Sequence, residues 1–534
     1  MGIGVTAGAV AVGGVATNAS ASERGASDSS GAADSLVFDP DDYTEVTESI
    51  ADAAGDKHTV VYRFYKPRDY VTNPSDSTHQ SLVVSVPVKI DGKAVDASRA
   101  PVVFANSVGA YMPSSVAKAT GVGQNELEMT GMAAPGGGGS ASGAPGGAPA
   151  GGTSAGGPSG GTGAVNGMVN LAKLAVVAGY VAVEPGARGR SLTDSSGAYY
   201  GTAPAAIVDL KAAVRYVRFN RGRIPGDTDR IVSTGTSAGG ALSALLGASG
   251  DSPLYDRYLE EAGAAPASDA VFATATWCPI TDLEHADGAY EWIWGTNATQ
   301  STGKTVDQTV SKALRTQFAE YQAGLRLRGL DGYGPLTARN YDDYLLRTYF
   351  QPSATKYLAA LSETDRTAYL KKNTFITWSG GRATFAWDDF LTHVGARKKT
   401  APAFDAFDLS AGENNEFGED TTEARHFTAY SLANDTTGVT GKRLASDIPG
   451  LLRLMNPMHH IEERNRNRSR HWWIRLGTSD SDTSPTVSAN LAAALDNLGD
   501  DVNHEYYWDQ GHATNVDPGD FITWVARVCG YRKR

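Results

Sequence analysis

Cysteine and positive charge are both scarce in this sequence. Only two cysteines, Cys278 and Cys529, occur among 534 residues, so neither a disulfide framework nor a cysteine-rich metal site underlies the fold. The 47 Lys and Arg residues are outnumbered by 59 Asp and Glu residues, for a formal net charge of −12. Nucleic acids and anionic membranes attract basic surfaces, so neither is expected as the main partner.

Long apolar runs are missing as well. No stretch reaches the ~18 consecutive apolar residues that cross a bilayer, so no membrane span is expected. The N-terminal segment "GIGVTAGAVAVGGVATNASAS" is small and apolar and ends in an Ala-x-Ala pattern at 19–21. It is typical of the apolar region and cleavage site of a secretory signal, although the basic leading residues are absent. We therefore expect a secreted or cell-surface protein; the alternative is a flexible tail.

Glycine is abundant, and its distribution separates three serines. The pattern G-x-S-x-G, which presents a nucleophilic serine in many hydrolases, occurs at Ser154, Ser159 and Ser237. The first two lie within 134–163, a tract of Gly, Ala, Pro, Ser and Thr that predicts a flexible loop and produces such matches by composition alone. Only Ser237 follows a β-branched strand pattern and precedes an Ala-rich helix pattern. Ser237 is therefore the predicted nucleophile.

The chain predicts an α/β fold with a mostly parallel sheet and helices on both faces. Strand patterns alternate with helix patterns from 166 to 280 and again after 465, as parallel sheets require. Between them, 281–465 is rich in aromatic and charged residues and is interpreted as a large inserted lid domain. The predicted organisation is a signal-like or disordered segment (1–37), a first core part with the Gly-rich loop (38–280), the lid (281–465) and a second core part (466–534).

Oxyanion stabilisation is expected at two amides. Ala238 opens the helix after Ser237, so its N–H and the helix N-terminus can bind a developing negative charge. The second amide in such folds comes from the loop after an early buried strand. Here that loop is "NSVGAY" at 106–111, with Gly109 and Ala110 as candidates; a simple turn glycine is the alternative.

The acid and the base are expected after two late strands. Asp480 and Asp482 follow the strand pattern at 471–477, and His512 follows the pattern at 502–508. The order Ser, acid, His is the order of α/β-hydrolases, and parallel strands bring these loops to one edge of the sheet. The residues alone leave Asp480 and Asp482 as alternatives for the acid, and a loop-lining role as the alternative for His512.

Several segments together resemble a known family. "EPGARGRSL", "GTAPAAIVDLKAAVRYVRFN", "TGTSAGGALSALLGASGD", "WCPITDLEHADGAYEW" and "GTSDSDTSPTVSANLAAALDNLG" are similar to bacterial tannases (tannin acyl hydrolases) of subtype B, α/β-hydrolases with a large lid. With the segments between them they cover most of residues 55–530. The resemblance implies Ser237 as nucleophile, Asp480 as acid and His512 as base.

The resemblance also implies a galloyl site. Asp482, Lys399 and Glu413 would hold the ring hydroxyls, and Ile280 would pack against the ring. By composition alone Lys398 is an equal candidate beside Lys399, and Glu416 and Glu419 stand close to Glu413.

The function expected from these residues is a serine esterase that hydrolyses gallate-type or protocatechuate-type esters through an acyl-enzyme. The partner is a small phenolic ester, and neither a metal nor an organic cofactor is needed. An esterase for feruloyl or chlorogenate-type esters is the nearest alternative. A serine peptidase and a non-catalytic binding protein on the same fold are more distant alternatives.

Overall fold

The computed structural model describes residues 35–127, 169–439, 441 and 443–532. The predicted Gly-rich loop with Ser154 and Ser159, and nearly all of the signal-like N-terminal segment, lie outside the described residues. The division into core and lid parts stays a prediction.

One ten-stranded sheet forms the centre of the molecule. Its strands are β1 (Tyr43–Ala51), β2 (Lys57–Asp69), β3 (Ser81–Ile90), β4 (Lys93–Ala94), β5 (Pro101–Ala105), β8 (Val181–Pro185), β9 (Asp227–Thr236), β10 (Ala273–Trp277), β15 (His471–Gly477) and β16 (Asp501–Tyr507). The spatial order is β1-β2-β3-β8-β5-β9-β10-β15-β16, and β4 pairs with β3. From β8 to β16 all pairings are parallel, whereas those of β1 to β4, and of β3 with β8, are antiparallel. The predicted α/β class with a mostly parallel sheet is confirmed.

The burial of the strands follows their sequence patterns. Every residue of β5, β8 and β10 is buried, as expected for apolar strands covered on both faces. In β2, buried residues alternate with partly buried ones from Val60 to Phe64, and the strand pairs with β3 in antiparallel fashion. β1 was not predicted, because its sequence "YTEVTESIA" is mostly polar and places few residues against the core.

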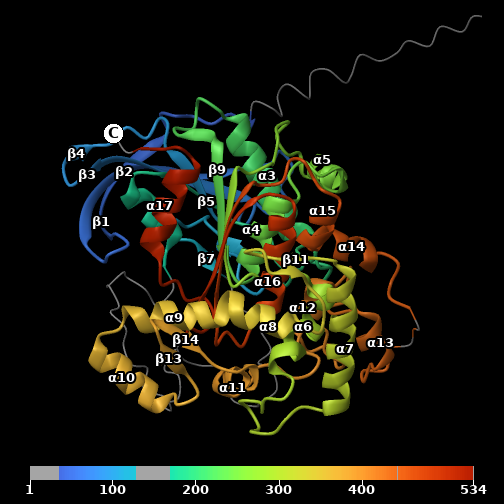
Figure 1. Ribbon diagram of the computed structural model, residues 1–534. Coiled ribbons are helices and arrows are strands. Elements are labelled where there is room, and N and C mark those ends of the chain that lie inside the picture. Colours follow the sequence, from blue (N-terminus) through green and yellow to red (C-terminus); the bar gives the residue numbers. More distant parts are fainter. Residues whose placement is uncertain (1–34, 128–168, 440, 442, 533–534) are drawn as a thin grey trace, which may run out of the picture.

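Helices cover both faces of the sheet. α2 (Leu171–Ala178) and α17 (Pro518–Val528) lie on one face, while α3 (Ala205–Phe219), α4 (Ala238–Ala248) and α16 (Pro485–Asn497) lie on the other (Figure 1). α4 is buried along its whole length, and its small residues allow it to approach β9 and β10. A 3-10 helix, η1 (Pro253–Tyr255), and α5 (Asp256–Ala262) complete this part.

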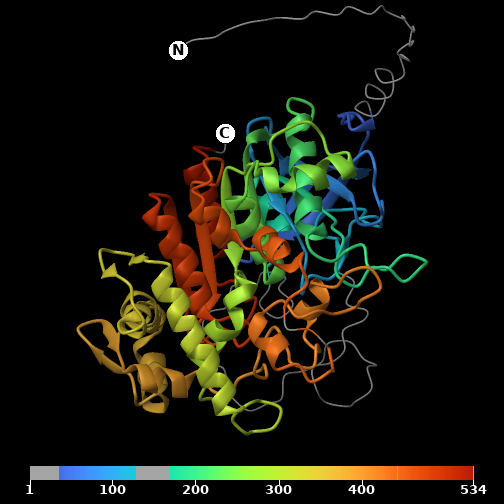
Figure 2. The same ribbon diagram turned by 90° about the vertical axis from the view of Figure 1, so that its right-hand side faces the viewer.

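A long series of helices connects β10 to β15. They are α6 (Leu283–Trp294), α7 (Gln308–Gly324), α8 (Tyr341–Leu345), the π-helix η2 (Leu346–Phe350), α9 (Gln351–Ala360), α10 (Glu363–Lys372), α11 (Trp387–His393), α12 (Gly412–Glu416), α13 (Ala429–Ala433), α14 (Ile448–Met455) and α15 (Pro457–Glu462). Two of them, α6 and α15, pack against the face helix α16. The two-stranded pairs are β6 (Ser114–Ser115) with β7 (Glu126–Leu127), β11 (Arg328–Gly329) with β12 (Gly334–Pro335), and β13 (Thr377–Ser379) with β14 (Arg382–Thr384). α8 to α11 lie below the sheet in both ribbon views (Figures 1 and 2). Ser353 of α9 donates to the carbonyl of Tyr506 at 2.9 Å, near the carboxyl end of β16.

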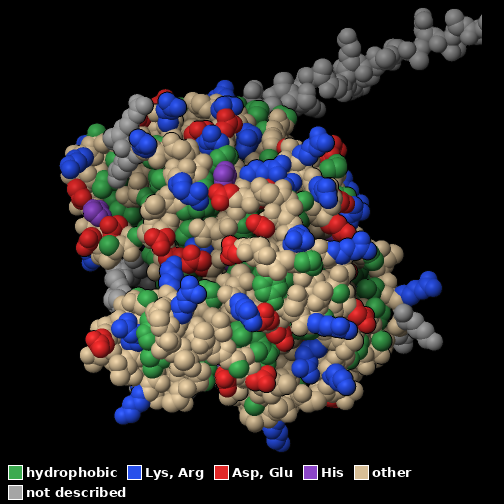
Figure 3. Space-filling model, in the orientation of Figure 1, with side chains coloured by type: hydrophobic (Ala, Val, Ile, Leu, Met, Phe, Trp, Pro, Cys, Tyr) green, Lys and Arg blue, Asp and Glu red, His purple; other side chains and the backbone are tan. Residues whose placement is uncertain are grey.

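The surface carries mixed charge. On the face drawn in Figure 3, Lys and Arg side chains are interspersed with Asp and Glu side chains. Within the described residues, no helix combines the length and apolar character that a membrane crossing needs.

Candidate active site

Ser237 occupies a strained turn between β9 and α4. Its backbone has φ 60° and ψ −125°, a region that a residue with a side chain rarely adopts. The neighbouring glycines make the turn possible, since a Cβ on Gly235 would lie 2.2 Å from the carbonyl oxygen of Gly239. A Cβ on Gly240 would lie 2.6 Å from the carbonyl oxygen of Trp277 on the adjacent strand. The sequence pattern therefore corresponds to a tight strand–turn–helix unit that has no room for larger residues.

Asn106, which sequence reasoning missed, ties the loop after β5 to this turn. Its side-chain nitrogen donates to the carbonyls of Thr234 and Gly239 at 3.0 and 3.1 Å, and to Ser243 Oγ at 2.9 Å. Its side-chain oxygen accepts from the N–H of Val108 at 3.3 Å. The asparagine is buried, so these contacts fix the 106–111 loop against both β9 and α4.

The three residues expected as a triad lie in contact. His512 Nε2 is 2.9 Å from Ser237 Oγ, and His512 Nδ1 is 2.9 and 3.0 Å from the two carboxylate oxygens of Asp480. Asp480 is almost fully buried, and it also accepts from the N–H groups of Asp482 and Thr483 at 2.9 and 3.1 Å. This arrangement lets His512 remove a proton from Ser237 while Asp480 orients the ring and stabilises its charged form.

The pKa of His512 reflects opposing influences. Burial alone lowers it, but the neighbouring Cys278 and Asp480 raise it, and the net pKa lies above the ordinary value. Cys278 is the second group near the ring: its Sγ lies 4.0 Å from His512 Nε2, and its backbone is left-handed at φ 39°. Because the serine oxygen is over an ångström closer, Ser237 is the better placed nucleophile.

Of the two expected oxyanion groups, Ala238 directly follows Ser237 and Gly109 belongs to the loop after β5. Ala238 is buried at the start of α4. Gly109 is in the loop that Asn106 holds, and the next two residues, Ala110 and Tyr111, have positive φ values of 50° and 56°. Such strain in non-glycine residues persists only where the surrounding contacts enforce it.

The expected ring-binding residues take part in two ion pairs. Lys399 Nζ lies 3.8 Å from Glu413 Oε1 and 4.0 Å from the centre of the Phe404 ring, and both charged side chains are largely buried. Asp482 instead pairs with Lys398, whose Nζ lies 2.7 Å from one carboxylate oxygen. Burial raises the pKa of Asp482, but His512, Lys398 and Lys399 together lower it by more, so the net pKa lies below its ordinary value.

Tyr290 joins these pairs to the triad loop. Its hydroxyl donates to the carbonyl of Ser481 at 2.8 Å and accepts from the N–H of Lys399 at 3.3 Å. Tyr290 belongs to α6, so a single buried ring contacts both the segment that carries Asp482 and the segment that carries Lys399. Ile280, the remaining expected contact, is buried just after β10.

Arg397 fixes the backbone of the segment that carries Lys398 and Lys399. Its guanidinium donates to both carboxylate oxygens of Glu291. It also donates to the backbone carbonyls of Lys399 and Thr400, at 2.8 Å in both cases. Both side chains of the Arg397–Glu291 pair are fully buried. The positions of Lys398 and Lys399 therefore depend on a buried ion pair.

Breaking that pair should be costly. The substitution Glu291→Gln leaves the buried guanidinium without its counter-charge, so we expect the free energy of unfolding to fall by about 3–5 kcal/mol. Urea denaturation measures this change. The control is Glu126→Gln, which removes the same charge from an exposed pair with Lys118 and should hardly alter the midpoint. Equal midpoints for the two variants would contradict the role given to Arg397.

Two groups of side chains bring potential metal ligands within 4.8 Å of one another among the described residues. They are Cys278, Asp480 and His512, and Asp282, Glu284 and His285. In each group a histidine Nδ1 already contacts a carboxylate, at 2.7 Å between His285 and Asp282.

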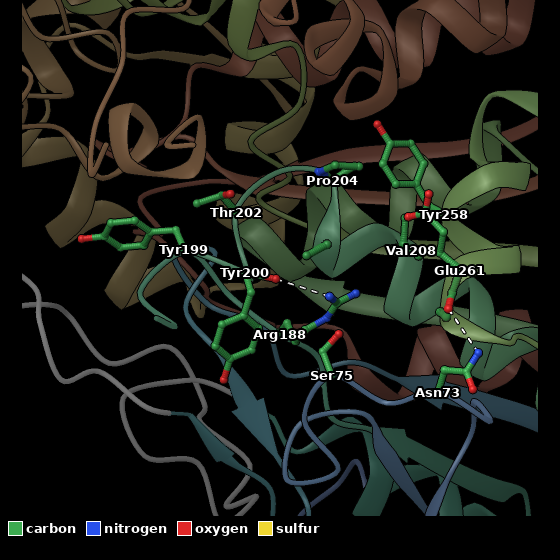
Figure 4. Close-up of a pocket in the computed structure, with 12 residues that line it drawn as sticks. Asn73, Ser75, Arg188, Tyr199, Tyr200, Thr202, Pro204, Val208, Tyr258 and Glu261 are labelled. Atoms are coloured by element: carbon green, nitrogen blue, oxygen red, sulfur yellow. Dashed lines mark hydrogen bonds between the residues drawn. The ribbon is translucent and has the colours of Figure 1, made fainter. Parts of the chain in front are cut away.

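A separate cavity of about 250 Å³ lies outside this site (Figure 4). Its lining includes Tyr199, Tyr200, Tyr258 and Glu261, but no residue of the triad. Arg188 on its wall is occupied by Asp209, to which it donates at 2.8 and 2.9 Å. This cavity is therefore not where the reacting groups meet.

A serine on a strand–turn–helix unit at the carboxyl edge of a mostly parallel sheet defines the α/β-hydrolase class. The comparisons agree with this class. A family model described as BD-FAE matches residues 167–321. Esterase LipQ of Mycobacterium tuberculosis is 39% identical over 92 residues, which are 17% of this chain and only 21% of that protein.

Solved structures extend the similarity to almost the whole chain. Tannase from Fusobacterium nucleatum is 33% identical with a TM-score of 0.74, over 92% of this chain and 99% of that chain. The native tannin acyl hydrolase from Lactobacillus plantarum is 32% identical, with the same TM-score and coverage. A tannin acyl hydrolase in complex with 3,4-dihydroxybenzoate matches to the same extent. The chain belongs to the tannase family and is a carboxylic ester hydrolase.

Proposed function

We propose that the protein hydrolyses esters of gallic acid and related hydroxybenzoic acids through Ser237, His512 and Asp480. The observation that carries this proposal is the contact of 2.9 Å between Ser237 Oγ and His512 Nε2, with Asp480 behind the ring. Two related solved structures hold 3,4-dihydroxybenzoate and ethyl gallate, which supports a hydroxylated benzoyl group as the acyl part.

The reaction follows from the roles of these groups. His512 takes the proton of Ser237 as Oγ bonds to the ester carbonyl carbon, and the N–H groups of Ala238 and Gly109 stabilise the oxyanion. His512 then passes the proton to the leaving alcohol oxygen as the carbon–oxygen bond of the ester breaks. Water, deprotonated by His512, attacks the acyl-enzyme; the Oγ–carbon bond breaks and Oγ regains a proton from His512.

Lys399, Glu413 and Asp482 are the proposed partners of the ring hydroxyls. Phenolic hydroxyls donate well to carboxylates and accept from an ammonium group, and such charge-assisted hydrogen bonds contribute roughly 1.5–3 kcal/mol each. The pair of Lys399 and Glu413 is largely buried, and its 3.8 Å separation is longer than a hydrogen bond, so a ring without hydroxyls would leave part of the pair's hydrogen-bonding capacity unused. A site of this kind selects hydroxylated rings over plain ones. Ile280 would pack against the ring.

The selectivity can be tested with methyl gallate and methyl benzoate. For Lys399→Ala and Glu413→Ala we expect kcat/KM to fall at least about tenfold on methyl gallate, because one charge-assisted hydrogen bond is lost. Methyl benzoate, which has no ring hydroxyls, should be affected little. Steady-state kinetics on both esters measure the ratio.

Lys398→Ala is the matched control for this experiment. Its side chain is half-exposed, unlike that of Lys399, and it pairs with Asp482. A larger loss of gallate selectivity for Lys398→Ala than for Lys399→Ala would exchange the roles of the two lysines. If the wild-type protein prefers methyl ferulate to methyl gallate, the feruloyl-type alternative replaces the proposal.

A further inference from the structure

The segment after β8 is wedged between the loop after β5 and helix α12. The backbones approach so closely that a Cβ on Gly189 would lie 2.2 Å from the nitrogen of Pro113. Ala187 and Ser114 exchange two backbone hydrogen bonds of 3.0 Å. On its other side, the N–H of Ala203 donates to the carbonyl of Glu416 at 2.8 Å. Residues 186–203 therefore contact both the loop that carries Gly109 and the helix that carries Glu413.

Arg190, in this segment, contacts both the loop after β5 and helix α12. Its backbone N–H donates to the carbonyl of Tyr111 at 2.9 Å, and its Nε donates to the carbonyl of Ala110 at 2.9 Å. Its Nη1 donates to the side-chain oxygen of Asn415 on α12 at 2.7 Å. Arg190 is only 7% exposed, so these bonds form away from bulk water. A Cβ on Gly412, the first residue of α12, would lie 2.8 Å from Nη2, which shows how closely the guanidinium approaches that helix.

The two ends of the guanidinium act on different parts of the proposed site. The Nε end fixes the strained residues Ala110 and Tyr111, directly after Gly109. The Nη1 end fixes Asn415, two residues after Glu413 on the same short helix. In the proposed function, the first of these parts stabilises the reacting carbonyl and the second binds the ring hydroxyls.

We propose that Arg190 is a positioning residue that sets the spacing between the oxyanion loop and Glu413, and so makes turnover depend on a hydroxylated ring. This inference rests on the proposed function. Arginine suits the role because its planar guanidinium presents donors in two fixed directions, which a lysine ammonium cannot do.

Glu416 supports the proposal from the other side of the guanidinium. This side chain is only 1% exposed, and neither carboxylate oxygen has a hydrogen-bond partner among the described residues. Burial raises the pKa of Glu416 well above its usual range; Arg190 lowers it and Glu413 raises it. Glu416 accepts no hydrogen bond from Arg190, whose guanidinium bonds the loop and Asn415 instead.

The test measures the ratio of kcat/KM for methyl gallate to that for methyl benzoate in Arg190→Lys. We expect this ratio to fall about tenfold, because one hydrogen bond to a charged donor is lost on the side of Glu413. Arg468→Lys is the matched control: Arg468 is equally buried, but it pairs with Asp500 far from α12 in the sequence. It should lower stability without moving the ratio.

Gly412→Ala keeps the inference falsifiable if Arg190→Lys folds poorly, and a double variant tests whether the effect passes through Glu413. Gly412→Ala keeps the arginine but displaces its guanidinium, and it should lower the same ratio. In a Glu413→Gln background, Arg190→Lys should no longer change the ratio, since the residue through which it acts is already lost.

The outcomes separate this inference from the proposed function. Suppose that Glu413→Gln lowers the ratio, while Arg190→Lys and Gly412→Ala lower kcat/KM equally for methyl gallate and methyl benzoate. Arg190 then only supports the fold, and the inference is overturned. If the wild-type protein does not prefer methyl gallate at all, the proposed function itself fails. The inference is also overturned if Arg190→Lys lowers the ratio by the same factor in the wild-type protein and in the Glu413→Gln background. The effect of Arg190 would then not pass through Glu413.

Discussion

Replacing Ser237 with alanine should lower kcat for every ester by about 10⁴–10⁶-fold, because binding and oxyanion stabilisation are all that remains without the nucleophile. The fold should be preserved, since the side chain makes no helix-capping hydrogen bond and, among the described residues, is hydrogen-bonded only to His512. Steady-state kinetics on methyl gallate, with a melting curve for each variant, measure both quantities.

The chain provides two matched controls for this substitution. Ser154→Ala and Ser159→Ala alter the same pentapeptide pattern in the Gly-rich tract and should leave kcat unchanged. A fluorophosphonate probe should label the wild-type protein and both control variants but not Ser237→Ala. Retention of more than a few per cent of activity in Ser237→Ala would show that another residue, such as Cys278, attacks the ester.

The substitution Asp480→Asn should lower kcat by about 10⁴-fold on esters with or without ring hydroxyls. An amide in this position can donate to His512 Nδ1 and so favour the wrong tautomer, in which Nε2 cannot accept the serine proton equally well. The amide also carries no charge to stabilise the imidazolium.

The pH profile gives a second readout for Asp480. His512 must be neutral to act as a base, so activity is lost as the pH falls through its pKa. Burial lowers that pKa, while Cys278 and Asp480 raise it. Removing the carboxylate should therefore move the acidic limb of kcat/KM to lower pH. An acidic limb that stays in place would mean that a different group titrates.

Asp482→Asn is the control for this experiment. It alters a carboxylate in the same loop that pairs with Lys398 rather than with His512. We expect its effect to be confined to hydroxylated rings. If Asp482→Asn instead suppressed turnover of methyl benzoate as strongly as Asp480→Asn does, the two residues would belong to one catalytic network.

The core of the fold was predictable from local patterns. β9, the turn at Ser237 and α4 follow from a β-branched run, closely spaced glycines and an Ala-rich helix within about twenty consecutive residues. The meeting of Ser237 with His512 follows from parallel strands, because their carboxyl ends share one edge. Such inferences need only the spacing of apolar residues along the chain and the order of the strands and helices that this spacing predicts.

The ring-binding region was less predictable, because it depends on contacts between distant segments. The sequence gives Lys398 and Lys399 the same charge and the same neighbours, yet one is half-exposed and the other is packed over Phe404. Arg397, which is paired with Glu291, donates to the carbonyl of Lys399 and so fixes the backbone from which the two side chains extend. No local pattern signals that pairing across about a hundred residues.

Asn106 and Arg190 were missed for a similar reason. Each is a single polar residue in a loop, which in sequence reads as an ordinary turn or surface position. Their burial and their several hydrogen bonds become visible only when loop and helix are placed together. The signal that the sequence does contain is a nearby glycine, Gly189 next to Arg190 and Gly239 facing Asn106. Glycine is needed at both positions because a Cβ would collide with neighbouring atoms.

The loop that carries Asp480 and Asp482 has a consequence for attempts to redesign the acyl preference. The N–H of Asp482 donates to a carboxylate oxygen of Asp480. Asp482, which is proposed to bind the ring hydroxyls, therefore also helps to position Asp480, which contacts His512. A substitution at 482 that shifts the backbone would alter turnover together with selectivity. Glu413 lies on a separate helix with no such bond to the triad. New acyl groups should therefore be sought by varying position 413 and its neighbours first, leaving the loop from 480 to 483 unchanged.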